Sequence, residues 1–81
     1  MAEIQPIRQL IRTQFLFDED AALGDEDPLF PDVIDSLGVM EVVDFVEETY
    51  EVSLSEDDLV ADNFKSLAAI GALVDRKRNG G

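Results

Sequence analysis

Ser36 is the residue whose type and position offer the most specific chemistry in this sequence. It follows Asp35 where an acidic loop meets the start of a predicted helix. Either side chain can cap that helix, because serine and aspartate oxygens accept hydrogen bonds from the free N–H groups of a first turn. If Asp35 is the cap, the Ser36 hydroxyl stays free at the first helical position. A phosphate ester on that hydroxyl would lie near the positive end of the helix dipole.

Other catalytic or metal chemistry has few residues to support it. The sequence has no Cys and no His, which excludes disulfides, thiolate nucleophiles, zinc–sulfur sites and histidine bases. A serine–lysine pair would need Lys65 as its base, and nothing marks that residue for the role. The acids of residues 18–27 fail the EF-hand pattern, because Leu29 stands where a bidentate glutamate is needed. We therefore expect no catalytic residue and no metal site.

Acidic side chains dominate the surface that this sequence can form. The 81 residues have a formal net charge of −13, and residues 18–62 hold 17 acids and no base. Nucleic acid and anionic lipid are disfavoured as partners, because both attract Lys and Arg. The acidic block either serves solubility or steers basic partner proteins. No apolar run approaches the ~20 residues of a membrane span and no signal pattern begins the chain, so we expect a cytoplasmic protein.

Apolar residues at spacings of three and four predict an all-α fold. The first helix is predicted over residues 3–17 and the second over residues 36–50. A long acidic connection, residues 18–35, joins them. Its apolar residues indicate that it packs on the helices rather than forming a free linker.

The second half of the chain is predicted to add two further helices. A short third helix or helical turn falls within residues 56–63, and a fourth helix runs over residues 66–78, where basic residues complement its C-terminal dipole. The predicted architecture is one domain, residues 1–81, folded as a small four-helix bundle with a long first loop and a short third helix. We expect residues 78–81 to form a frayed tail.

Two apolar side chains lie on the acidic face of the second predicted helix. Its valines share the opposite, apolar face, whereas Leu37 and Met40 fall among carboxylates. These acids are Glu41, Asp44, Glu47, Glu48 and Glu51. Two explanations remain open: scattered surface apolar residues are common, and an apolar patch with an acidic rim can also contact a basic partner.

The sequence resembles the acyl carrier proteins, a family of phosphopantetheine-binding carriers. The match includes Asp35-Ser36-Leu37-Gly38, the acidic helix after it and Asp27-Pro28-Leu29-Phe30 before it. Residues 56–59 and 63–70 resemble the third-helix region and fourth helix of free-standing carriers. The resemblance therefore covers nearly the whole chain.

This resemblance implies a mechanism. A holo-acyl-carrier-protein synthase or another phosphopantetheinyl transferase would move 4′-phosphopantetheine from coenzyme A to Ser36, with a magnesium ion that Asp35 helps to hold. The thiol of the arm would then hold acyl groups as thioesters. The carrier, a monomer without catalytic activity, would deliver them to synthases and acyltransferases with basic docking surfaces. By position, docking involves Leu37, Met40, Glu41, Asp44, Glu47, Glu48, Glu56 and Asp57.

Departures from the family pattern point to a specialised carrier. Ile34 stands where fatty-acid carriers usually have a small residue, and Glu51 stands where a glycine commonly ends the second helix. We expect a dedicated carrier in a fatty-acid, polyketide, lipid or related pathway. Two alternatives stay open. One is an aminoacyl carrier loaded by an adenylating ligase, and the other is an acidic interaction module in which Ser36 only caps a helix and holds no prosthetic group.

Overall fold

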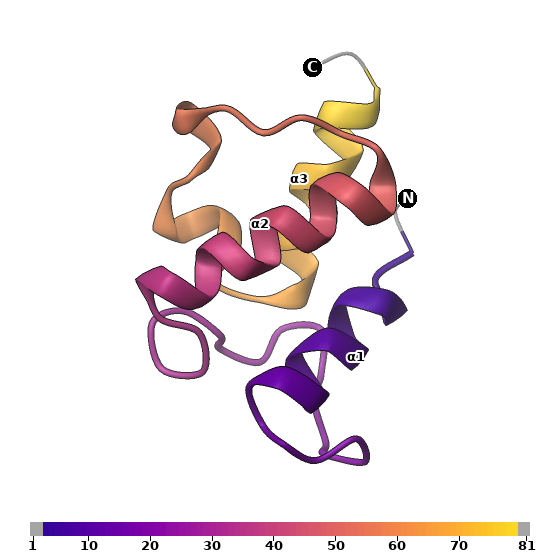
Figure 1. Ribbon diagram of the computed structural model, residues 1–81, viewed down its shortest axis with the longest axis vertical. Helices are drawn as coiled ribbons and strands as arrows, with labels where there is room; N and C mark the ends of the chain where they lie inside the picture. The colour runs from indigo at the N-terminus through magenta and orange to yellow at the C-terminus, as the bar shows by residue number, and fades with distance from the viewer. Residues whose placement is uncertain (1–2, 80–81) are drawn as a thin grey trace.

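The computed structural model describes residues 3–79, and these residues form an all-helical fold (Figure 1). In Figure 1, α2 crosses the middle of the molecule, with α1 below it and α3 behind it. No strand occurs between residues 3 and 79. The elements in chain order are α1 (Gln5–Gln14), α2 (Ser36–Tyr50), the short 3-10 helices η1 (Glu56–Asp58) and η2 (Ala61–Phe64), and α3 (Leu67–Arg78).

Within residues 3–79, the structure has three α-helices and does not confirm the predicted four-helix bundle. Where a short third helix or helical turn was predicted, it has two 3-10 turns, at residues 56–58 and 61–64. Val60 separates them in an extended conformation, with φ −117° and ψ 151°. The first turn is closed locally, since the Ser55 N–H donates to Asp58 Oδ2 at 2.9 Å. Aspartate and asparagine side chains compete for backbone hydrogen bonds and so favour turns over helix interiors. The segment therefore stays as isolated turns.

The other helix bounds follow the predictions, with differences at the ends. Helix α1 is shorter than the predicted 3–17, because the chain turns after it and Phe17 is left-handed, with φ 55°. Helix α2 has the predicted bounds. Helix α3 includes Arg78, the first residue of the predicted frayed tail, and the Asn79 N–H still donates to the Asp75 carbonyl at 3.0 Å. Residues 80–81 of that tail lie outside the described residues.

One apolar core joins the three α-helices with the long connection between α1 and α2. Ile7 and Ile11 come from α1, and Leu73 from α3. Leu29 and Ile34 come from the long connection and are fully buried. The connection therefore packs on the helices, as its apolar residues predicted.

Hydrogen bonds to the backbone of this connection fix its path. Arg8 Nε donates to the Leu23 carbonyl at 3.0 Å, and Arg12 Nε donates to the Ala21 carbonyl at 2.8 Å. Farther on, the Leu29 N–H donates to the Lys65 carbonyl at 2.8 Å. The connection thus follows α1 and then meets the start of α3 before it enters α2. Within residues 3–79, no helix is long and apolar enough to cross a membrane.

Candidate functional site

Asp35 is the cap of α2. Its Oδ1 accepts a hydrogen bond from the Gly38 N–H at 2.8 Å, and its carbonyl accepts the first helical bond, from Val39, at 2.9 Å. The Asp35 backbone is extended, with φ −93° and ψ −171°, as an N-cap requires. Of the two caps that the sequence left open, the structure therefore uses Asp35 and not Ser36.

Ser36 is consequently the first residue of α2, with an exposed side chain that makes no capping bond. A helix of 15 residues begins at this point, so its positive dipole end lies beside the hydroxyl. A phosphate ester on Ser36 would keep its charge in water and near that dipole. The position therefore fits a phosphate-linked prosthetic group.

Gly38 lets α1 approach the first turn of α2 closely. A Cβ atom at this position would lie 2.7 Å from Cε1 of Phe15, which is shorter than a carbon–carbon contact of about 3.5 Å allows. The Phe15 ring thus occupies the space that a side chain at position 38 would need, and glycine leaves that space free. Sequence reasoning quoted Gly38 as part of the motif and missed this contact, although a glycine inside a helix is itself a signal of close approach.

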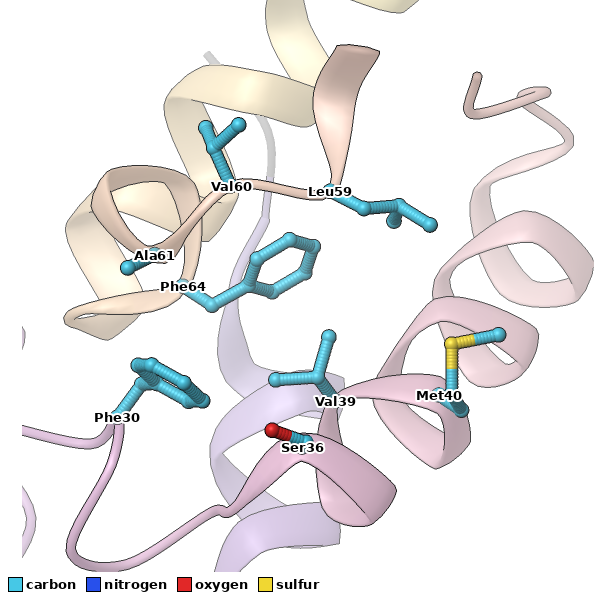
Figure 2. Close-up of a pocket in the computed structure, with 8 residues that line it drawn as sticks. All are labelled: Phe30, Ser36, Val39, Met40, Leu59, Val60, Ala61 and Phe64. Carbon is cyan, nitrogen blue, oxygen red and sulfur yellow. The ribbon is translucent and has the colours of Figure 1, made fainter. Parts of the chain in front are cut away.

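A cavity of about 180 Å³ opens directly beside Ser36. Figure 2 shows α2 on one side of it and the segment 59–64 on the other, with Phe30 of the long connection beside both. The residues that line it are Phe30, Ser36, Val39, Met40, Leu59, Val60, Ala61 and Phe64. Seven of these eight side chains are apolar, and the Ser36 hydroxyl is the single polar one.

Polar contacts tie the segment 59–64, which forms the wall of the cavity opposite α2, to α3. Lys77 Nζ lies 2.9 Å from Asp58 Oδ2, and Arg76 Nη2 donates to Asn63 Oδ1 at 3.1 Å. Asn63 Nδ2 also donates to the Asp58 carbonyl at 2.8 Å. The hydrogen bond from the Ser55 backbone, followed by that from Lys77, lowers the pKa of Asp58 below its ordinary value. The carboxylate form therefore supports this wall at neutral pH.

The apolar patch predicted on α2 is at the surface. Leu37 is 83% exposed and Met40 is 49% exposed. Glu41, Asp44 and Glu48 are exposed too. With Leu37 they recur at spacings of three and four, which places them on one face of the helix. The structure thus brings Ser36 and this acid-rimmed patch together at the start of α2.

The remaining predicted docking residues are arranged differently. Glu56 and Asp57 are exposed on η1, past the turn that follows α2. Glu47 is half-buried, and its Oε2 accepts a hydrogen bond from the Leu54 N–H at 2.9 Å. Glu47 therefore holds the chain after α2 in place, a role that the helical pattern did not reveal.

The comparisons with known proteins agree with this geometry. Residues 5–74 match the family model described as a phosphopantetheine attachment site. The chain belongs to this carrier family. Its prosthetic group is 4′-phosphopantetheine, attached covalently. The chain is also 34% identical over 67 residues to a "Probable acyl carrier protein PigG" of Serratia sp. (strain ATCC 39006), a match that covers 82% of this chain and 77% of that protein.

In this carrier protein, the cavity walls are the part of the site that sequence reasoning did not assemble. Phe30 was noted within a loop motif and Phe64 within a resemblance to the last helix. Neither pattern placed them beside Ser36. Val39 was assigned to the apolar face of α2, which is correct but incomplete because it also lines the cavity. These residues meet only through packing between distant segments.

Proposed function

We propose that this protein is an acyl carrier and that Ser36 is the residue that bears its 4′-phosphopantetheine. The observation that supports this most directly is the exposed Ser36 hydroxyl at the start of α2, left free because Asp35 makes the capping bond. The thiol at the end of the arm supplies a thioester linkage that a chain without cysteine does not have. The carrier itself performs no catalysis.

Attachment is a phosphoryl transfer with coenzyme A as donor. The Ser36 oxygen forms a bond to the phosphorus next to the pantetheine unit. The bond from that phosphorus to the bridging oxygen breaks, and adenosine 3′,5′-bisphosphate leaves. The serine proton passes to a base of the transferase, because this chain has no His and the neighbouring Asp35 carboxylate is engaged in capping α2. Asp35 acts here as a positioning residue that fixes the first turn of α2.

The cargo that we favour is an acyl group, and the pathway is a specialised fatty-acid, polyketide, lipid or related one. The name of the Serratia relative, a probable acyl carrier protein, supports this preference. An aminoacyl carrier has the same site and differs in the enzyme that loads it. Incubation of the phosphopantetheinylated protein with acyl ligases and with amino-acid ligases separates the two. Loading by amino-acid ligases alone would replace the acyl assignment.

We propose that partner enzymes dock on the exposed face of α2 around Leu37 and Met40. The surrounding carboxylates and the acidic stretch of residues 18–62, which has no base, attract partners with basic surfaces. The partners are a phosphopantetheinyl transferase, a loading ligase and the enzymes that use the acyl group. Donor coenzyme A is intracellular, so we assign the protein to the cytoplasm, where it works as a monomer.

The test is an intact mass before and after incubation with coenzyme A, magnesium and a broad-specificity phosphopantetheinyl transferase. We expect a gain of one phosphopantetheinyl group in the parent protein and none in the Ser36→Ala variant. Since Asp35 provides the cap, Ser36→Ala should leave stability nearly unchanged, and circular dichroism checks this. Ser55→Ala is the matched control, because Ser55 is also exposed at a turn start and should not affect the mass gain. A folded parent protein that gains no mass would contradict attachment at Ser36.

A further inference from the structure

We propose that the cavity beside Ser36 seats the geminal dimethyl group of the phosphopantetheine arm, and that the acyl cargo stays outside the helices. The inference rests on the proposed attachment at Ser36. It concerns what the walls around that residue bind, which neither the family match nor the relative specifies. Three features of the cavity lead to it: its chemistry, its position and its size.

The chemistry of the walls selects an apolar group. Every lining side chain other than Ser36 is aliphatic, aromatic or a thioether. Figure 2 shows the Phe64 ring and the Val39 methyl groups directed toward each other across the space, with the Ser36 hydroxyl at its edge. An amide or hydroxyl placed there would lose its hydrogen bonds to water without replacement. The amide and hydroxyl groups of the arm therefore belong outside the cavity.

The position of Ser36 selects the near part of the arm. Ser36 is itself a wall residue, so whatever is bonded to its oxygen starts at the cavity mouth. In phosphopantetheine, the carbon that holds two methyl groups is separated from the phosphorus only by an oxygen and a methylene. The thiol lies beyond two amide groups. Cargo on that thiol could reach the same walls only if the whole arm doubled back, which would order its rotatable bonds at an entropic cost.

The size of the cavity favours a compact group over a long chain. Its volume is about 180 Å³, and a cavity of roughly 150 Å³ in another protein holds a benzene-sized ligand. A carbon with two methyl groups fits such a space, whereas an extended acyl chain does not. Phe64 is only 1% exposed, so it closes the inner side of the cavity.

The walls are also held in place before any ligand arrives. The contacts Lys77–Asp58 and Arg76–Asn63 tie the segment that bears Leu59, Val60 and Ala61 to α3. A wall anchored at both ends of that segment resists the widening that a longer guest would need. We therefore infer a preformed seat for a compact group.

The experiment compares two phosphopantetheine arms, one with and one without the geminal methyl groups, on the intact protein. Coenzyme A and an analogue whose arm lacks both methyl groups are each loaded onto Ser36, and intact mass verifies loading. Isotope-filtered nuclear Overhauser spectra are then recorded between the unlabelled arm and the 13C-labelled protein. We expect contacts from the arm methyl groups to Val39 and Phe64. We also expect removal of the two methyl groups to lower, about tenfold, the ratio of arm bound in the cavity to arm free in solvent. This ratio is read from the Val39 and Phe64 chemical shifts.

Filling the cavity supplies the second comparison. Val39→Phe should abolish the contacts between the arm and Phe64, with Val39→Leu as the smaller filling change if the first variant does not fold. Thr49→Phe is the matched control, because it adds the same ring to an exposed site on the same helix away from the cavity. The contacts should persist in that protein.

The outcomes separate this inference from the function on which it rests. Absence of mass gain would remove the attachment at Ser36 and this inference with it. Mass gain without contacts from the arm methyl groups would overturn only the inference. Contacts from an attached acyl chain to Phe64, in place of those from the arm, would overturn it in favour of buried cargo.

Discussion

Replacing Gly38 by Ala tests whether Phe15 positions the first turn of α2 and hence Ser36. The added Cβ would lie 2.7 Å from Phe15 Cε1 and 3.4 Å from Asp35 Oδ1. Carbon atoms pack at about 3.5–4.0 Å, so the ring or the helix must move by about 1 Å. Phe15 is half-buried and packed against the core, and overpacking of this kind costs about 1–3 kcal/mol.

Helix propensity opposes this overpacking cost, so the sign of the change in the free energy of unfolding shows which effect is larger. Alanine is favoured over glycine inside a helix by about 1 kcal/mol. With Phe15 in place, we expect Gly38→Ala to lower the free energy of unfolding by up to about 2 kcal/mol, the difference between the two terms. In a Phe15→Leu background the smaller side chain leaves room. The same substitution should there raise the free energy of unfolding by up to about 1 kcal/mol.

The assay is urea unfolding, followed by circular dichroism, of the parent, Gly38→Ala, Phe15→Leu and the double variant, which together form a double-mutant cycle. The coupling energy should be about 1–3 kcal/mol, well above the few tenths seen for independent sites. Gly71→Ala is a useful comparison, because its Cβ would meet only the Ile4 side chain, also at 2.7 Å, which lies near the chain start and can turn aside. Equal stabilisation by Gly38→Ala in both backgrounds would refute the argument that the Phe15 ring limits this turn.

Further predictions concern charge and backbone strain. Glu51 ends α2 in a left-handed conformation, with φ 55° and ψ 50°; Glu51→Gly should therefore raise stability by about 1 kcal/mol, and in thermal melts Glu51→Gln should gain less because it removes the charge and keeps the strain. Equal gains would assign the effect to charge alone. The pKa of Asp58 is lowered in the folded protein, so its stabilising contribution is present above its unfolded pKa and is lost as pH falls through its folded pKa. The stability difference between parent and Asp58→Asn, measured by urea unfolding, should thus be largest at neutral pH and vanish in acid; a constant difference would contradict this. Glu41→Lys should slow transfer of the prosthetic group to Ser36 and weaken the dependence of that rate on salt, whereas Glu19→Lys, an equal charge change on the exposed long connection, should have a smaller effect. Equal rates for both variants would place docking elsewhere. Added Mg²⁺ or moderate salt should raise the melting temperature by screening the 17 acids of residues 18–62, and an unchanged value would show that this surface is not strained by repulsion.

Local patterns made much of the fold predictable from the sequence. The bounds of α2 follow from apolar residues at spacings of three and four and from the capping residues just before it. The exposure of Leu37 and Met40 follows from the same spacing. The bounds of α1 were less predictable, because its pattern of apolar residues continues past Gln14 while the chain itself turns at Phe17.

The sequence by itself determined the helices, the acidic surface and a serine at the start of α2, because each depends on residues close together in the chain. The structure, and not the sequence pattern, showed that Asp35 is the cap, that Glu47 holds the Leu54 backbone and that 3-10 turns occupy residues 56–58 and 61–64, although these contacts join residues close together in the chain. Tertiary structure alone decided the cavity beside Ser36, whose walls come from the long connection, α2 and the segment 59–64. Segments so far apart meet only because the shared core fixes their relative positions, and no local spacing encodes that packing.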